Sequence, residues 1–208
     1  MKLLRETIRR LIFESACDLV NDKIFHAIEE IVYQGLTVHS RIRSNSLAVE
    51  IYNYGPNGEI LVGFLEAEKP SDSLGNCLGA FIVTETHVEV PYRGNSGFGA
   101  LLYDVALELV GEQGLDADRR NVSSDAVRIW NYFLNSPDYI KKSLDNFDGE
   151  YTPNRKEDDC EAVSFLKHGG SKTDSKEEFQ NHALNNVIIK KNTSRNTINC
   201  LTDRGVYQ

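Results

Sequence analysis

The sequence predicts a mixed α/β fold in which helices flank a mixed, mostly antiparallel sheet. Three observations indicate this fold. An apolar helical period ends near residue 35 and gives way to short apolar runs that turn-forming residues separate. A longer apolar run then ends at a glycine-rich turn, and two amphipathic helical segments follow it. Helices before and after a set of strands are typical of α/β and α+β domains.

Length, charge and hydropathy limit the class of protein. The chain has 208 residues and a formal net charge of −8, which fits one domain of roughly 100–150 residues with a remainder. A chain that mainly binds nucleic-acid phosphates needs a basic surface, so we expect no nucleic-acid partner. The sequence shows neither an apolar run of roughly 18–20 residues nor a secretory leader, so we expect no membrane span and a cytoplasmic location.

The chain divides into four segments by composition. Residues 1–15 predict a basic amphipathic helix, and residues 16–140 predict the folded core. Residues 141–190 form a polar extension with two short apolar runs that predict two late strands, at 162–166 and 187–189. Residues 191–208 are expected to be a mobile polar tail.

The first half of the core predicts one helix and four strands. Residues 19–33 keep the helical period, and Gly35 supplies a stop for the helix. Pro91 ends the last strand of this half. The predicted strands are 37–43, 47–52, 60–65 and 78–90.

The second half of the core predicts two helices. The first covers 97–111 and has one apolar side, while Asp104 and Glu108 are expected to face solvent. The second begins at Ser123 or Ser124 as the N-cap and contains Trp130, which we expect in the core. A short strand or a loop at residues 115–118 connects the two helices.

The four cysteines and five histidines predict no metal centre. The cysteines are scattered along the chain, which favours buried reduced thiols over disulfides or a zinc site. No H-E-x-x-H pattern occurs. The cysteines are Cys17, Cys77, Cys160 and Cys200.

The most informative stretch is a strand that runs through three glycines, Gly94, Gly97 and Gly99, into a helix. Glycines at such a junction let backbone amides converge, and the helix N-terminus carries partial positive charge, so the junction suits a phosphate group. The glycines have the spacing G-x-x-G-x-G, the reverse of the dinucleotide-binding fingerprint. No Lys-Ser/Thr pair follows them, as a nucleoside-triphosphate loop requires.

This stretch reads V-x-V-P-Y-R-G-N-S-G-F-G-A-L-L and resembles the coenzyme A-binding signature of the GNAT acetyltransferase superfamily, often V-x-P-x-Y-R-G-x-G-x-G-x-x-L-L. The likeness covers roughly residues 19–134 and is strongest to GNAT domains encoded by phages or bacteria. Two departures are present. One residue is missing after Pro91, and one is extra between Gly94 and Gly97, so Arg93 lies four residues before Gly97 instead of three.

The resemblance implies a splayed, mostly antiparallel sheet with acetyl-coenzyme A in the gap after the long strand. The pantetheine arm would bond to the strand backbone, and the pyrophosphate would meet amides of the glycine loop. The coenzyme-binding residues that it implies are Val88, Val90, Arg93, Gly94, Asn95, Ser96, Gly97, Phe98, Gly99 and Ala100.

The resemblance also implies a general base on the long strand. Glu85, His87 and Glu89 alternate along that strand and therefore share one face. Glu85 is the first candidate and Glu89 the second. His87 is a substitute, because its unperturbed pKa of roughly 6.5 suits proton transfer. The alternative is that all three are polar residues on a solvated strand face.

The general acid of the family is usually a tyrosine four residues after the alanine of a helix motif, N-x-x-A-x-x-L-Y. The matching motif here ends in Trp130, whose indole is no useful acid. Tyr132 or Tyr103 would then supply the proton, or no side chain does.

The implied function is an acetyl-coenzyme A-dependent N-acetyltransferase that moves an acetyl group directly to a primary amine. The acceptor is an amine-bearing small molecule or protein, and the acidic surplus of the chain suits a cationic amine. No metal is required. The alternative is a catalytically inactive binding or structural protein of the same fold, associated with the virion if a phage encodes it. The expected location is the cytoplasm of a bacterium, or of the host in the phage case.

Overall fold

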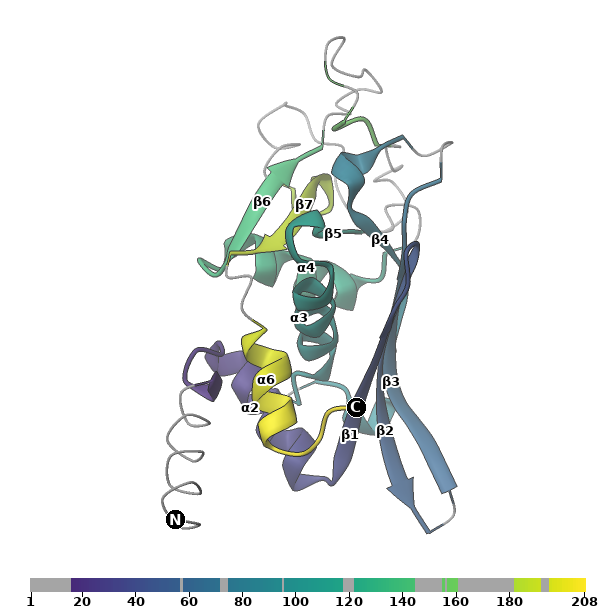
Figure 1. The fold of residues 1–208 in the computed structure, drawn as a ribbon, viewed down its shortest axis with the longest axis vertical. Helices are drawn as coiled ribbons and strands as arrows, with labels where there is room; N and C mark the ends of the chain where they lie inside the picture. Colours follow the sequence, from purple (N-terminus) through teal and green to yellow (C-terminus); the bar gives the residue numbers. More distant parts are fainter. Residues whose placement is uncertain are drawn as a thin grey trace.

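The computed structural model describes residues 16–56, 58–71, 75–94, 96–117, 122–144, 155, 157–160, 182–191 and 195–208. These residues form four α helices and one seven-stranded sheet, shown in Figure 1. The predicted mixed α/β fold is confirmed. The helix predicted over 1–15 and the strand predicted over 162–166 lie outside the described residues.

The strand order of the sheet is β1-β2-β3-β4-β5-β7-β6. Every neighbouring pair is antiparallel except β4 and β5, which run parallel. The strands are β1 (Leu36–Ile42), β2 (Ser46–Gly55), β3 (Gly58–Glu68), β4 (Phe81–Val88), β5 (Leu115–Ala117), β6 (Tyr139–Ser143) and β7 (Asn186–Lys190).

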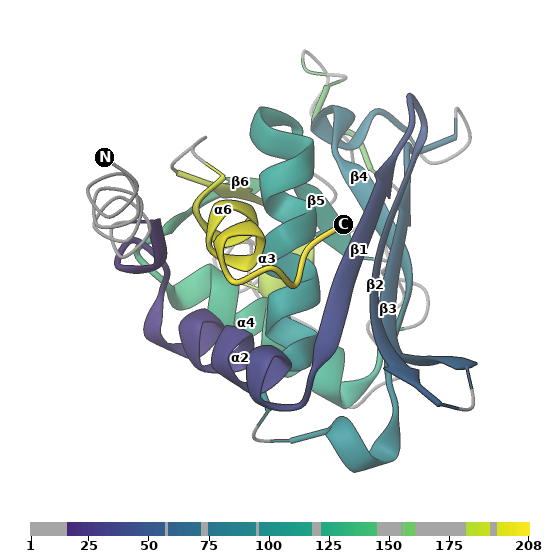
Figure 2. The ribbon, with the colours of Figure 1, turned by 60° about the horizontal axis from the view of Figure 1, so that its bottom comes forward.

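Four α helices accompany the sheet in the described part of the chain. The helices are α2 (Asp22–Tyr33), α3 (Phe98–Val110), α4 (Ser124–Asn135) and α6 (Asn196–Asp203). Figures 1 and 2 show all four on the same side of β1, β2 and β3. The outer face of these strands therefore points away from the helices.

Local capping explains where two of the helices begin. The Asn21 side chain accepts a hydrogen bond from the Lys23 amide at the start of α2. The Ser123 hydroxyl accepts one from the Ala126 amide at the start of α4, as predicted. Both bonds satisfy donors that a helix leaves unpaired in its first turn.

Helix α3 lies at the centre of the molecule and is buried on nearly all sides. It packs against β2, β3, β4 and β7, and α2 and α6 cover it further. The expectation that Asp104 and Glu108 face solvent is wrong, because their residues are 0% and 7% exposed. Helices α2 and α6 cover the face of α3 that would be exposed to water in a domain of two layers.

The expected extension belongs to the same sheet as the core. The predicted strand at 187–189 is confirmed as β7, which lies between β5 and β6. Strand β6 begins at Tyr139, so the division placed at residue 140 cuts through it. Only Tyr139 of this strand is buried, so the strand has no alternation of buried apolar and exposed polar residues.

The last residues are folded, in contrast to the expected mobile tail. Helix α6 buries Ile198, Cys200 and Leu201. The chain end then lies beside β1, where the Val38 amide donates to the Val206 carbonyl oxygen at 2.7 Å. Three buried apolar side chains in a short polar helix are too few to give a clear helical period, so packing decides this element.

The cysteines form two disulfides, Cys17–Cys200 and Cys77–Cys160, so the expectation of reduced thiols is wrong for this structure. The partners are separated by 183 and 83 residues in sequence. These separations in sequence do not reveal which cysteines lie close together in space, because the fold brings them together. Within the described ranges, none of the helices combines the length and apolar character needed to cross a bilayer.

Candidate functional site

The parallel strands β4 and β5 pair over the first residues of β4 and the whole of β5. Phe81 lies opposite Leu115, and Val83 lies opposite Ala117. β5 ends at Ala117, whereas β4 continues to Val88. In the part of the chain that the structure describes, residues 85–88 therefore have a strand neighbour only on the β3 side.

A β-bulge follows the residues of β4 that pair with β5. Glu85 pairs with Glu66 of β3, whereas Val83 pairs with Ala67, so Thr84 is an extra residue on β4. A bulge bends its strand and raises the local twist, and bulges are common next to active sites. The bulge therefore bends β4 directly after the residues that pair with β5.

The glycine loop follows β4 and leads into α3. Gly97 is the N-cap residue of α3, with φ 74°, and as a glycine it has no side chain to cap the helix. The Ser96 hydroxyl lies 3.5 Å from the Phe98 amide and donates to the Tyr92 carbonyl oxygen at 2.5 Å. The first turn of α3 is thus suited to an anion. Asn95 lies outside the described residues.

Two of the three glycines also allow close helix packing. A Cβ on Gly97 would lie 3.2 Å from the Ala27 Cβ of α2. A Cβ on Gly99 would lie 2.8 Å from the Ile129 Cδ1 of α4. These glycines therefore have a structural role whether or not a phosphate binds.

Three of the residues expected to bind the coenzyme, Val88, Val90 and Arg93, lie at or just beyond the end of β4. The predicted strand over 78–90 is too long, because short 3-10 helices, Cys77–Gly79 and Val90–Tyr92, lie at its two ends. Val90 is consequently outside the strand and 70% exposed. The Arg93 Nε donates to the carbonyl oxygen of Val88 at 2.6 Å, so Arg93 bonds to the last residue of β4.

The three base candidates lie close together near the end of β4. Glu85 and Thr84 are exposed, and Glu85 lies opposite another carboxylate, Glu66. The His87 ring stacks on Phe64, with centroids 6.1 Å apart. His87 Nε2 lies 3.5 Å from a carboxylate oxygen of Glu89. These contacts are consistent with the prediction that the side chains of Glu85, His87 and Glu89 share one face of the strand.

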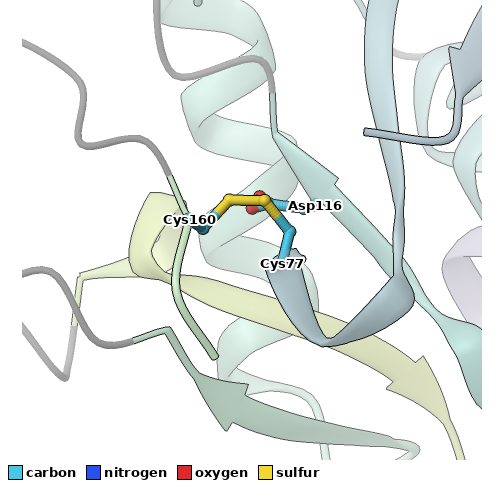
Figure 3. Close-up of side chains that lie close together, drawn as sticks. All are labelled: Cys77, Asp116 and Cys160. Carbon is cyan, nitrogen blue, oxygen red and sulfur yellow. A yellow bond between two sulfur atoms is a disulfide. The ribbon is translucent and has the colours of Figure 1, made fainter. Parts of the chain in front are cut away.

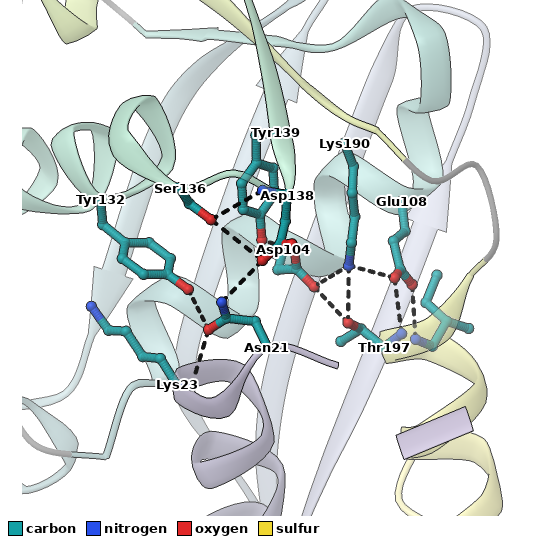
Figure 4. A network of polar contacts seen from close by, with 11 residues as sticks. Asn21, Lys23, Asp104, Glu108, Tyr132, Ser136, Asp138, Tyr139, Lys190 and Thr197 are labelled. Carbon is teal, nitrogen blue, oxygen red and sulfur yellow. Dashed lines mark hydrogen bonds and ion pairs between the residues drawn. The ribbon is translucent and has the colours of Figure 1, made fainter. Parts of the chain in front are cut away.

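The two candidate tyrosines lie in different surroundings. The Tyr132 hydroxyl donates to Asn21 Oδ1 at 2.6 Å, and the Lys23 ammonium lies 4.4 Å from the ring centroid. Burial raises the pKa of Tyr132 to about 12, and Asp104 and Asp138 add to the effect. The contacts of Tyr132 are therefore with the start of α2, as Figure 4 shows.

Tyr103, in contrast, contacts β4. It is 1% exposed, its ring centroid lies 5.2 Å from that of Trp130 of α4, and its hydroxyl lies near Thr86 of β4. Burial raises the pKa of Tyr103 well above its ordinary value, and the polar groups of Thr86 and Trp130 oppose this shift. Trp130 is 1% exposed, which confirms it as a core residue.

A buried polar network that the sequence did not reveal joins α3 to the last elements of the chain (Figure 4). Lys190 of β7 places its ammonium 2.7 Å from Asp104 and 2.6 Å from Glu108. Tyr139 donates to Asp104 at 2.5 Å, as does the Thr197 hydroxyl. A signal was present in the sequence, since two carboxylates four residues apart lie within a strongly apolar helix.

The network shifts the ionisation of its members. Burial raises the pKa of Glu108, the Lys190 charge lowers it, and the nearby Asp104 charge raises it. Burial lowers the pKa of Lys190, but the attraction of Asp104 and Glu108 outweighs burial and raises it overall. These groups are satisfied by one another, so the network is a structural element rather than a binding site.

Comparisons of the chain with protein-family models, with curated proteins and with solved structures gave no match. A proposal for the class of protein therefore rests on the glycine motif and on the geometry around β4.

Proposed function

We propose that this chain is an acetyl-coenzyme A-dependent N-acetyltransferase that transfers the acetyl group directly to a primary amine. One observation carries the proposal: among the described residues β4 has no strand neighbour beyond Val83 on the side away from β3, and the glycine loop joins its end to the N-terminus of α3. An open strand edge and a helix N-terminus side by side suit a ligand that has both amide groups and a pyrophosphate.

The two parts of the coenzyme would bind to two parts of this site. The amides of the pantetheine arm would pair with the β4 backbone near Thr86 and Val88, as an added strand does. Arg93 would release the Val88 carbonyl oxygen, which it now contacts. The pyrophosphate would accept hydrogen bonds from amides of residues 96–100, with Arg93 as a mobile cation nearby.

The chemistry needs a base, an oxyanion donor and a proton for the leaving thiolate. The amine nitrogen attacks the thioester carbonyl carbon, and the tetrahedral oxyanion collapses as the carbon–sulfur bond breaks. Glu85 is the first candidate to take the proton of the amine, with Glu89 and His87 as alternatives. Tyr103 is the better placed tyrosine to protonate the thiolate, because it lies near Thr86 of β4 whereas Tyr132 bonds to Asn21.

The proposed acceptor is a cationic amine, either a small molecule or a lysine-bearing protein. Glu66 and Glu85 lie opposite each other on exposed strand positions, and Glu89 follows nearby. A cluster of negatively charged carboxylates attracts a protonated amine and raises its local concentration. The same carboxylates then accept the proton that the amine must lose.

Acetyl-coenzyme A titration of a charge-reversal variant tests the binding step. Gly97→Glu is a poor choice, because its Cβ would approach Ala27. Arg93→Glu places a negative charge beside the loop, and we expect affinity to fall at least about tenfold by calorimetry. Arg43→Glu, at an exposed position outside the site, makes the same charge change and should leave affinity nearly unchanged. Absence of binding to the wild-type chain would reject the proposal.

A second candidate is a binding or structural protein of this fold that does not perform the transfer. Its support is that Trp130 is buried in the core at the position of the usual acid, and that Tyr132 is bound to Asn21. A thiol-release assay with a panel of amines separates the two candidates. Coenzyme binding with no thiol release favours the second, which for a phage protein includes association with the virion.

We propose a cytoplasmic location for either candidate. The cytosol keeps most thiols reduced, so this location requires that the two disulfides of the structure be reduced to dithiols there. Alkylation of the chain during lysis, followed by mass measurement, tests this. Four alkylated cysteines support the location, and two intact disulfides contradict it.

A further inference from the structure

Cys77, Cys160 and Asp116 form a buried cluster that no part of the proposed transfer uses. The two sulfurs and a carboxylate oxygen of Asp116 all lie within 4.8 Å of one another. The three residues are 0%, 3% and 1% exposed. Figure 3 shows that they come from three segments: the turn before β4, strand β5, and the segment that ends at Cys160.

Backbone contacts hold these segments together independently of the disulfide. The Cys77 amide donates to the Asp159 carbonyl oxygen at 2.8 Å, and the Leu78 amide donates to that of Glu157. Gly75 and Cys160 form an isolated β-bridge. A Cβ on Gly75 would lie 2.5 Å from the Asp159 carbonyl oxygen, so the two segments approach as closely as only glycine allows. Reduction of the disulfide would leave these backbone contacts in place.

Asp116 directs a carboxylate oxygen at the sulfurs. Its Oδ1 accepts a hydrogen bond from the Ala117 amide at 2.8 Å, and its Oδ2 lies 3.4 Å from the Cys160 sulfur. A disulfide is neutral and needs no anion beside it. Two thiolates and a carboxylate, however, are a donor set that zinc binds tetrahedrally, with water in the fourth position.

We propose that Cys77, Cys160 and Asp116 form a binding site for a zinc-class divalent cation when the Cys77–Cys160 disulfide is reduced. A small or protein dithiol supplies two electrons and two protons and becomes a disulfide itself, while the Cys77–Cys160 bond breaks into two thiols. The cation then replaces both thiol protons, which leave to solvent. Rotation about the two Cα–Cβ bonds separates the sulfurs to make room for the ion.

Electrostatics favour the ion in the reduced state. Two thiolates and one carboxylate without a cation would place three negative charges in a buried cluster, which is strongly unfavourable. A divalent cation reduces the total to a single negative charge. The metal would therefore join the turn before β4, strand β5 and residues 157–160, whereas the disulfide joins only the turn and residues 157–160.

Cobalt is the probe for this site, because thiolate ligands give Co²⁺ an intense charge-transfer absorption. The full chain is reduced with a dithiol, freed of reductant without oxygen, and titrated with Co²⁺ and then with Zn²⁺. We expect one Co²⁺ per chain with the thiolate band, which Zn²⁺ removes, and no band for the oxidised chain. A reduced wild-type chain without the band would overturn the proposal.

Two sets of variants assign the site to these residues. The double variant Cys17→Ser/Cys200→Ser removes the other cysteine pair and should keep the band. Cys77→Ser/Cys160→Ser should abolish the band, and Asp116→Asn should lower Co²⁺ affinity about 10-fold or more. Circular dichroism confirms that each variant is folded. A band that survives in Cys77→Ser/Cys160→Ser, or disappears in Cys17→Ser/Cys200→Ser, would contradict the assignment. Neither result depends on acetyl transfer.

Discussion

The Lys190 ammonium lies 2.6 Å from a carboxylate oxygen of Glu108 and joins β7 to the central helix α3. The same carboxylate also accepts hydrogen bonds from the Thr197 amide at 2.8 Å and the Ile198 amide at 2.9 Å. Glu108 thereby caps α6 from a distant part of the chain, because the N-cap residue Arg195 makes no capping bond with its side chain. This network explains why the C-terminal residues fold although their sequence is polar.

Loss of the Lys190 charge should destabilise the fold strongly. Lys190→Met leaves Asp104 and Glu108 buried without their cation, so we expect the free energy of unfolding to fall by about 3–5 kcal/mol. Urea denaturation followed by circular dichroism measures this change. Lys191→Met removes the same charge from the neighbouring exposed residue and should change stability by less than about 0.5 kcal/mol. Equal effects of the two substitutions would show that the network contributes little.

The contribution of Lys190 should also disappear at high pH. Its pKa is raised in the folded chain above the ordinary value of 10.5. The folded chain therefore keeps this proton in a range where the unfolded chain has lost it, and stability falls as pH rises through that range. We expect the stability difference between wild type and Lys190→Met to be constant between about pH 8 and 10 and to shrink above 10.5. A difference that grows with pH would contradict the raised pKa.

Gly114 should tolerate alanine far less well than Gly35. Gly114 has φ 74°, and a Cβ there would lie 2.6 Å from the Ile188 carbonyl oxygen of β7. Gly35 also has a positive φ, 64°, but a Cβ there would point into open space, with nothing beyond its chain neighbours within 4 Å among the described residues. We expect Gly35→Ala to cost about 1–2 kcal/mol and Gly114→Ala to cost at least about 3 kcal/mol, from strain and the backbone clash together. Thermal or urea denaturation of both variants checks the order.

Glu85→Gln should separate catalysis from coenzyme binding. If Glu85 is the base of the proposed transfer, its loss lowers turnover about 10²- to 10⁴-fold and leaves acetyl-coenzyme A affinity within about twofold. Glu59→Gln makes the same change at an exposed carboxylate of β3 outside the proposed site and serves as the matched control, with turnover near wild type. Turnover by thiol release and affinity by calorimetry are the measurements. An unchanged rate in Glu85→Gln would direct the search for a base to Glu89 and His87.

Elements with strong local signals could be predicted. The apolar period of α2 and the Ser123 cap of α4 were sufficient to place these helices, and the alternating runs placed β1, β2 and β3. The ends of β4 were wrong, because short 3-10 helices, Cys77–Gly79 and Val90–Tyr92, lie at both ends of the predicted strand. Strand β6 was missed, since pairing with β7 rather than its own side chains makes it a strand.

The candidate site was predictable in part, for the same reason. The glycine motif placed the loop and its helix, and alternation placed Glu85, His87 and Glu89 together. The sequence could not separate Tyr103 from Tyr132 as an acid, because their surroundings depend on contacts with β4 and α2. It also could not show that Gly97 and Gly99 pack against other helices.

The sequence by itself determined the mixed α/β class, most of the strands, and the loop that leads into α3, because these follow from patterns within a few residues. Only the tertiary structure decided the pairing of four scattered cysteines, the burial of Asp104 and Glu108 around Lys190, and the parallel pairing of β4 with β5. Each of these joins residues far apart in the chain. Their energies arise from desolvation and packing, which exist only once the folded chain excludes water.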